Sequence, residues 1–101
     1  MNRQEHLLVC LSEECAEVIK AVDKALRFGL NDGYPGTETT NEQDIQDEFA
    51  QAVAVMEMLE KEVFKDRDIG RLNRIIESKK AMVLEYMEYA KNTRGTLKEE
   101  A

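Results

Sequence analysis

Apolar residues recur at the spacing of an α-helix in three long segments of this chain, and this pattern constrains the fold more than any other feature. Steps of four and three residues align side chains along one face of a helix. In the second segment the aligned residues are Ile45, Phe49, Ala52, Met56, Leu59 and Val63. In the first they are Leu7, Leu11, Val18, Val22 and Ala25, and in the third Leu72, Ile76, Val83, Tyr86 and Ala90. No segment has the alternating pattern of a strand, so the sequence predicts an all-α fold with three long helices.

Capping residues and glycines predict where these helices begin and end. The first is expected over about residues 2–28, with Gly29 at its end. The second is expected to begin after Thr40 or Asn41, with Gln43 completing a capping box with Thr40, and to run to about residue 64. The third is expected over about residues 69–91, with Asp68 as its N-cap and residues 92–95 as its stop. Residues 29–40 carry three glycines and the only proline, which predicts a long loop.

A chain of 101 residues predicts one domain, here residues 1–95, followed by a frayed polar tail of residues 96–101. Three long amphipathic helices make an incomplete bundle with one open apolar edge. A symmetric homo-oligomer would close that edge. The predicted architecture is therefore a helical bundle that is completed by oligomerisation.

The composition excludes several classes of function. The net charge of −7 argues against direct binding to nucleic acid or to an anionic membrane. No apolar stretch has the length of a bilayer span, and the first residues lack the apolar run of a signal peptide. Cys10 and Cys15 are five residues apart on one predicted helix, so a disulfide between them is not expected. Free buried thiols, which we expect here, fit a reducing compartment, and the predicted location is the cytoplasm.

Two clusters of acidic residues repeat the same offsets on two different helices. The first is Glu13-Glu14-Cys15-Ala16-Glu17, and the second is Asp47-Glu48-Phe49-Ala50-Gln51. Offsets of one and four residues keep three side chains within about 100° of a helix face. So many carboxylates on one face repel each other unless a cation lies between them. Two such faces brought together would form an oxygen-lined site for a hard divalent cation.

Glu14 is the most informative of these acids, because it falls at the edge of the apolar stripe of the first helix. An inward carboxylate is costly unless it binds a metal or another cation. The alternative is a solvated helix face with ordinary charge pairs. Glu48 has the same position on the edge of its own stripe, which favours the metal site. Gln51 is neutral, and its amide oxygen is a weaker ligand that cannot act as a base.

Cationic and aromatic residues supply candidate contacts to a phosphate-bearing ligand. Lys79 lies within the apolar stripe of the third helix, so it either contacts negative charge or extends outward to solvent. Lys24 and Arg27 end the first helix, where they either hold phosphates or complement the helix dipole. The tyrosines are candidates either to flank a base or to pack on the protein: Tyr34, Tyr86 and Tyr89. His6 has no Glu-x-x-His partner and is expected at the surface.

At this point the sequence resembles the MazG-like, all-α nucleoside triphosphate pyrophosphohydrolases. Their signature is Glu-Glu-x-x-Glu on one helix and Glu-x-x-Asp on the next, and here these read Glu13-Glu14-Cys15-Ala16-Glu17 and Glu48-Phe49-Ala50-Gln51. Two further stretches look like the short, phage-type members: Lys24-Ala25-Leu26-Arg27-Phe28-Gly29 and Lys79-Lys80-Ala81-Met82-Val83-Leu84-Glu85-Tyr86. The resemblance covers most of residues 7–90.

The resemblance implies an enzyme that converts a nucleoside or deoxynucleoside triphosphate to the monophosphate and pyrophosphate. It implies a homodimer or a dimer of dimers, and Mg²⁺, with Mn²⁺ as an alternative, held by Glu14, Glu17 and Glu48. Glu13 or Glu17 would then orient or deprotonate the attacking water. The expected ligand set includes Gln51, and the expected substrate contacts are Lys24, Arg27, Lys79 and Tyr86.

Gln51 departs from the family pattern, because it stands where these enzymes have their final aspartate. Losing one carboxylate should weaken metal binding and turnover. The chain is therefore expected to be either a Mg²⁺-dependent hydrolase or a weak or inactive relative that binds a nucleotide or a protein partner. A purely structural oligomer is a third interpretation, which the inward positions of Glu14 and Lys79 disfavour.

Overall fold

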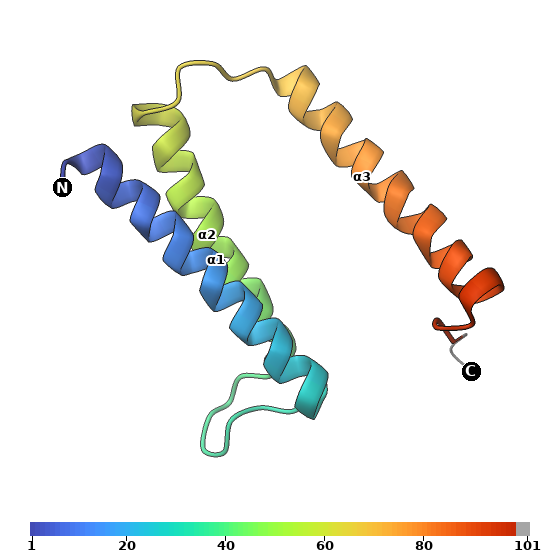
Figure 1. Ribbon diagram of the computed structural model, residues 1–101. Coiled ribbons are helices and arrows are strands. Elements are labelled where there is room, and N and C mark those ends of the chain that lie inside the picture. The colour runs from blue at the N-terminus through green and yellow to red at the C-terminus, as the bar shows by residue number, and fades with distance from the viewer. Residues whose placement is uncertain (99–101) are drawn as a thin grey trace. The chain divides into compact units, whose positions relative to one another are not determined.

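The computed structural model of the protein describes residues 1–98, and these residues form three long α-helices and one short π-helical turn (Figure 1). No strand occurs in this part of the chain, which confirms the all-α prediction with three helices. The chain divides into two compact units, Met1–Lys65 and Asp66–Ala101. The first unit contains α1 and α2, and the second contains α3 and the π-helical turn η1.

Helix α1 spans Arg3–Phe28; it ends at Gly29, as predicted, and begins with a capping box that the sequence analysis did not identify. The Asn2 side chain accepts a hydrogen bond from the backbone N–H of Glu5, and the Glu5 side chain accepts one from the N–H of Asn2. At the other end Gly29 has φ +95°, and its N–H donates to the carbonyl of Ala25. A residue with a β-carbon rarely adopts this φ, so glycine is the natural end of the helix.

Helix α2 spans Asn41–Glu62, and its beginning confirms the predicted capping box. Thr40 is the N-cap: its hydroxyl accepts from the N–H of Gln43, and its own N–H donates to the Gln43 side chain. The helix ends two residues before the predicted end at residue 64.

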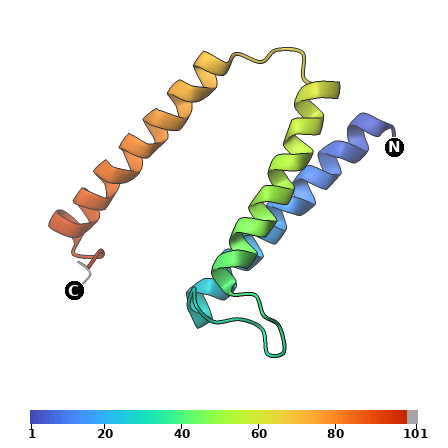
Figure 2. The same cartoon turned by 180° about the vertical axis from the view of Figure 1, so that it is seen from behind.

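Helices α1 and α2 lie side by side as an antiparallel hairpin, as both views show (Figures 1 and 2). On each helix the contact face follows steps of four and three residues. The buried or half-buried positions are 7, 10, 11, 14, 18, 21, 24 and 25 on α1 and 41, 44, 45, 48, 52, 55, 59 and 60 on α2. Leu59 is the one residue of the described chain with a fully buried side chain.

The predicted stripes were wrong at three positions of this hairpin. Val22 and Met56 are each 37% exposed and Phe49 is 60% exposed, whereas the neighbouring positions Ala21 and Ala52 are buried. A helix with a single partner buries only a narrow stripe. Because alanines occupy the centre of that stripe, the larger apolar side chains lie on its flank and remain open to solvent.

An ion pair joins the two helices at the end of the hairpin away from the loop. The Arg3 guanidinium donates to both carboxylate oxygens of Glu62, over 2.7 Å and 3.1 Å. This side-chain hydrogen bond lowers the pKa of Glu62, so the pair stabilises the fold above the ordinary pKa of a glutamate and is lost as the pH falls through the lowered value. Both groups face solvent, so the contribution is small.

Helix α3 spans Ile69–Tyr89 and begins at the predicted cap, where the Asp68 carboxylate accepts from the N–H of Arg71 over 3.0 Å. The chain then continues into the wider π-helical turn η1, Ala90–Arg94, which ends at Gly95 with φ +65°. The third helix was predicted to continue to residue 91, and it ends two residues earlier. No residue of α3 is buried within its own unit.

Residues 96–98 follow η1 outside any helix, and the remaining part of the predicted frayed tail, residues 99–101, lies outside the described residues. None of the helices in residues 1–98 combines the length and the apolar character that crossing a bilayer requires.

Candidate functional site

The acidic cluster of α1 places one carboxylate inside the hairpin and two outside it. Glu14 is half-buried at one of the contact positions, whereas Glu13 and Glu17 are exposed. The Oε2 atom of Glu14 is buried and has no hydrogen-bond partner among the described residues. A buried polar atom without a partner costs about 1–3 kcal/mol, and more when it carries charge. The unpartnered oxygen of Glu14 therefore destabilises the fold, and a bound cation would remove this destabilisation.

A hollow of about 220 Å³ lies along the hairpin on the side of Glu17. Helix α1 contributes Glu17, Lys20 and Lys24, and α2 contributes Asp44 and Glu48. We call this hollow the acidic groove. The antiparallel arrangement brings Glu48 near Ala21, so the two predicted acidic clusters contribute to the same groove. Glu17, Glu48 and Lys24 are thus three sequence-predicted site residues that the fold brings together.

Asp44 and Lys20 are groove residues that the sequence analysis did not single out. Asp44 precedes Glu48 by one helical turn, and Lys20 follows Glu17 by three residues. Helical spacing from the acids already chosen would have identified both. The groove therefore combines three carboxylates with two ammonium groups, and negative charge exceeds positive charge by one.

Gln51 is exposed on α2 and does not line the acidic groove. It neighbours Glu48 on the surface of α2, but it lies farther around the helix from the buried Ala52 than Glu48 does. Its predicted role as a metal ligand stays a prediction.

The hairpin supplies the kind of ligands that Mg²⁺ prefers. Carboxylate oxygens of Glu14, Glu17 and Glu48 come from neighbouring turns of two packed helices, and the unpartnered Oε2 of Glu14 needs a positive partner. Within residues 1–98, however, no three Asp, Glu, His or Cys side chains are gathered into a ready ligand set. The carboxylates are the type of ligand that a divalent cation prefers, but Glu14 does not line the acidic groove with Glu17 and Glu48.

Lys24 lies between the acidic groove and the long loop. It lines the groove, and its Nζ atom lies 5.7 Å from the centre of the Tyr34 ring, within the range of a cation–π contact. Arg27, one turn further on, places its guanidinium 5.4 Å from the ring centre of Phe28. Both predicted phosphate contacts thus stand at the loop end of the hairpin, next to aromatic rings.

The other two predicted substrate contacts, Lys79 and Tyr86, belong to the second unit. Both line a shallow hollow of about 550 Å³ on α3 and η1. The ring of Tyr86 meets that of Tyr89 edge to face, with 6.1 Å between centroids. Lys79 lies beside exposed apolar residues. Both of its predicted roles, contact with negative charge and extension to solvent, stay predictions.

Cys10 and Cys15 are free, as predicted, but neither is buried: Cys10 is half-buried and Cys15 is exposed. His6 is exposed, as predicted, with its Nε2 atom 3.6 Å from the Cys10 sulfur.

Comparison of the chain with protein-family models, with curated protein sequences and with solved structures finds no match.

Proposed function

We propose that this protein hydrolyses nucleoside or deoxynucleoside triphosphates to the monophosphate and pyrophosphate, with Mg²⁺ as cofactor. The observation that carries the proposal is Glu14, a carboxylate on the contact face of the hairpin with a buried oxygen that has no partner. A protein that keeps this costly group in its small core is expected to use it. The resemblance of residues 7–90 to the MazG-like enzymes supplies the reaction.

The predicted site residues fall into two groups: one would hold the metal and activate water, and the other would bind the substrate. Glu14, Glu17 and Glu48, with Gln51 as a weaker ligand, would hold Mg²⁺, which neutralises phosphate charge and activates a bound water. Glu13 or Glu17 would accept the proton of the attacking water, since both are exposed on α1. Lys24 and Arg27 would hold the phosphates at the loop end, and Lys79 and Tyr86 would complete the substrate contacts.

The proposed assembly is a homodimer, or a dimer of dimers, in which the three helices form a closed bundle. Its support is the amount of apolar surface that each unit leaves open. The exposed apolar residues include Leu8, Ile19, Leu26, Phe49 and Val53 in the hairpin and Ile75, Ile76, Met82, Val83 and Met87 on α3. Large exposed apolar surfaces on a small chain mark association sites.

We expect sedimentation velocity at micromolar concentration to detect a dimer or tetramer with no folded monomer. Phe49→Glu should shift the population toward smaller, less stable species, because the charge would enter an apolar contact. Gln46→Glu, at an exposed polar position of the same helix, is the control and should leave the assembly intact. A folded monomer of the unaltered chain would contradict the assembly.

We expect Gln51→Asp to increase nucleotide turnover. The substitution restores a carboxylate one turn from Glu48, and an added negative ligand should tighten Mg²⁺ and help to polarise its bound water. In chelator the same variant should melt at a lower temperature, because it adds repulsion to the cluster.

The test measures turnover and melting with and without Mg²⁺, and Gln46→Asp on the same helix is the matched control. The variant should gain more from Mg²⁺ than the unaltered protein does. If Gln51→Asp alters neither turnover nor the metal response, Gln51 lies outside the site, and the non-catalytic alternative becomes the better proposal.

The alternative proposal is a catalytically weak or inactive MazG-like protein that binds a nucleotide or a protein partner. The neutral and exposed Gln51 favours it. It predicts nucleotide binding without pyrophosphate release, which the same nucleotide panel distinguishes. In either case the proposed location is the cytoplasm, and neither nucleic acid nor a membrane is a proposed partner.

A further inference from the structure

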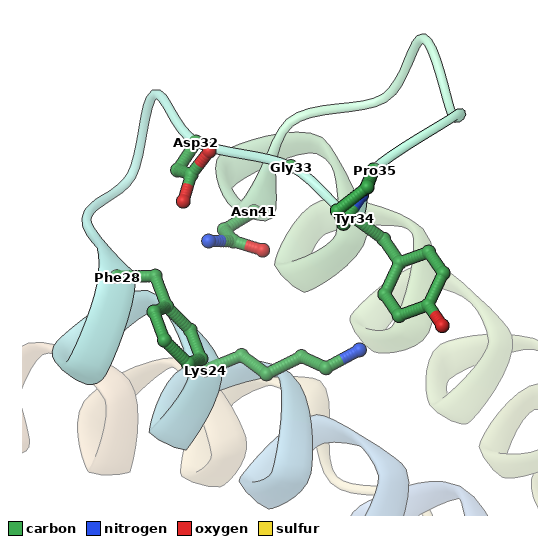
Figure 3. Close-up of a pocket in the computed structure, with 7 residues that line it drawn as sticks. All are labelled: Lys24, Phe28, Asp32, Gly33, Tyr34, Pro35 and Asn41. Atoms are coloured by element: carbon green, nitrogen blue, oxygen red, sulfur yellow. The ribbon is translucent and has the colours of Figure 1, made fainter.

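The long loop between α1 and α2 forms a pocket of about 370 Å³ against the last turns of α1 (Figure 3). This volume lies within the range of small-molecule sites, roughly 300–1,000 Å³. Side chains from both helices and the loop line it: Lys24, Phe28, Asp32, Tyr34 and Asn41. We call it the loop pocket. Lys24 lines both this pocket and the acidic groove, so the two are adjacent.

Hydrogen bonds across the base of the loop hold this pocket in shape. The N–H of Asn41 donates to the carbonyl of Asp32 over 2.6 Å, and the N–H of Glu42 donates to that of Leu30 over 3.0 Å. At Gly33 a β-carbon would overlap the carbonyl oxygen of Thr39, so the two sides of the loop approach as closely as a glycine allows. A pocket fixed in this way loses little entropy when a ligand binds.

A tight turn fixes the position of Tyr34. Its carbonyl accepts from both the N–H and the hydroxyl of Thr37, over 3.0 Å and 2.7 Å. Pro35 and Gly36 occupy the two central positions, and Gly36 has φ +88°. Proline followed by a left-handed glycine is the signature of a type II turn. The ring of Tyr34 is thereby presented at one side of the pocket, opposite Phe28 (Figure 3).

The polar groups of the loop pocket are mainly acceptors. The amide nitrogen of Asn41 donates to the carbonyl of Gly29 over 2.8 Å, which leaves the amide oxygen for a ligand. Figure 3 shows this oxygen on the side facing Tyr34. The Asp32 carboxylate makes no hydrogen bond to any described residue and is a second acceptor. Lys24 is the one cation that lines the pocket, and it stands on the side of the acidic groove.

We propose that the loop pocket binds a guanine base, and that it selects guanine nucleotides for the groove beside it. Two carboxylate oxygens match two adjacent N–H donors. Guanine offers such a pair in its ring N–H and its amino group, whereas adenine and cytosine place an acceptor beside their amino group. Uracil and thymine place carbonyls on both sides of their ring N–H. The base lies beside the Tyr34 ring, Asp32 accepts from its donor edge, and Lys24 contacts the first phosphate.

The assignment of a triphosphate substrate rests on the function proposed above, but recognition of the base does not require phosphate or metal. The test is therefore titration of the full chain with guanosine, inosine and adenosine in the presence of EDTA, followed by tyrosine fluorescence or by NMR. The affinity for guanosine should be at least roughly tenfold higher than the affinities for adenosine and for inosine, which lacks the amino group.

Three variants test whether Asp32 and Tyr34 of the loop pocket cause the binding and the preference for guanosine. Asp32→Asn should remove the preference for guanosine over inosine. Tyr34→Ala should weaken binding of both nucleosides about tenfold, and Tyr34→Phe should retain it. Asp23→Asn is the control, since Asp23 is an exposed acid of α1 that does not line the pocket. Equal affinities for guanosine and adenosine, absence of binding, or a preference that survives Asp32→Asn would overturn the proposal.

The outcomes separate this proposal from the enzymatic one. Selective guanosine binding without turnover of any triphosphate would retain the loop pocket and reject the hydrolase. Turnover of triphosphates without preference for guanine would retain the hydrolase and reject the pocket.

Discussion

Replacing Glu14 with leucine is expected to raise the stability of the protein in chelator and to abolish both its response to Mg²⁺ and its turnover. The Oε2 atom of Glu14 is buried without a partner, so an apolar side chain of similar size should be better accommodated on that face. The free energy of unfolding should rise by about 1–3 kcal/mol, the cost of a buried unpaired polar group.

Mg²⁺ should have the opposite effect on the unaltered protein. A cation that relieves repulsion among Glu14, Glu17 and Glu48 binds only the folded state, and at ~100 times its dissociation constant it adds roughly 2.7 kcal/mol. Without the Glu14 carboxylate this gain should disappear. The relative stability of the two proteins should therefore reverse between chelator and millimolar Mg²⁺.

Chemical denaturation in EDTA and in Mg²⁺ measures both effects. Asp23→Leu is the control, because Asp23 is an exposed carboxylate of the same helix. This variant should change neither the free energy of unfolding in EDTA nor the gain in Mg²⁺ by more than about 0.5 kcal/mol. A Glu14→Leu protein that is less stable in EDTA, or that still gains stability from Mg²⁺, would contradict the assignment of Glu14.

The second large effect is expected for Leu59→Ala. Leu59 has no exposed surface, and its carbonyl accepts from the N–H groups of both Val63 and Phe64 at the end of α2. Truncating a buried leucine costs about 2–5 kcal/mol, because apolar contact is lost and a cavity remains. In a small domain this is a large share of the total stability, so much of the protein should unfold at physiological temperature.

The matched control is Leu84→Ala on α3, where the leucine is 63% exposed and is not among the residues named above for the association surface. Thermal melts followed by circular dichroism should give a drop of about 10 °C or more for Leu59→Ala and a much smaller one for Leu84→Ala. Comparable drops for the two variants would contradict the assignment of Leu59 as the centre of the hairpin core.

The helices and their ends could be predicted from local sequence, because caps act over one turn. The Thr40–Gln43 capping box, the Asp68 cap and the Gly29 end all follow from residues within four positions of each other. The π-helical turn at Ala90–Arg94 could not be predicted, since the apolar pattern ends at Ala90 and the polar residues that follow indicate only that the helix stops.

The face of each helix that packs against its partner was harder to predict. Phe49 and Met56 are large members of the predicted stripe of α2, yet the hairpin buries the small Ala52 between them. A helix that carries apolar residues on two adjacent sides can pack through either side, and its composition alone does not show which side is buried. The same ambiguity placed Glu14 at the edge of the predicted stripe, whereas it occupies a position on the contact face.

The candidate site could be predicted in part. Glu17 and Glu48 were chosen for their helical spacing and do line one groove. Asn41 was considered only as a possible helix cap, and its role at the base of the loop depends on a hydrogen bond to Gly29, twelve residues away. Such contacts arise from the fold of the loop, which no local pattern specifies.

Hydrolysis of a nucleoside triphosphate in H₂¹⁸O tests the central claim most directly, with ³¹P NMR and mass spectrometry to identify the products. The proposed attack of water at the α-phosphorus predicts Mg²⁺-dependent release of pyrophosphate and places the heavy oxygen in the monophosphate. It also predicts that Glu48→Gln abolishes the reaction. Absence of turnover in the presence of Mg²⁺, release of orthophosphate, or the heavy oxygen in pyrophosphate would contradict the proposed function.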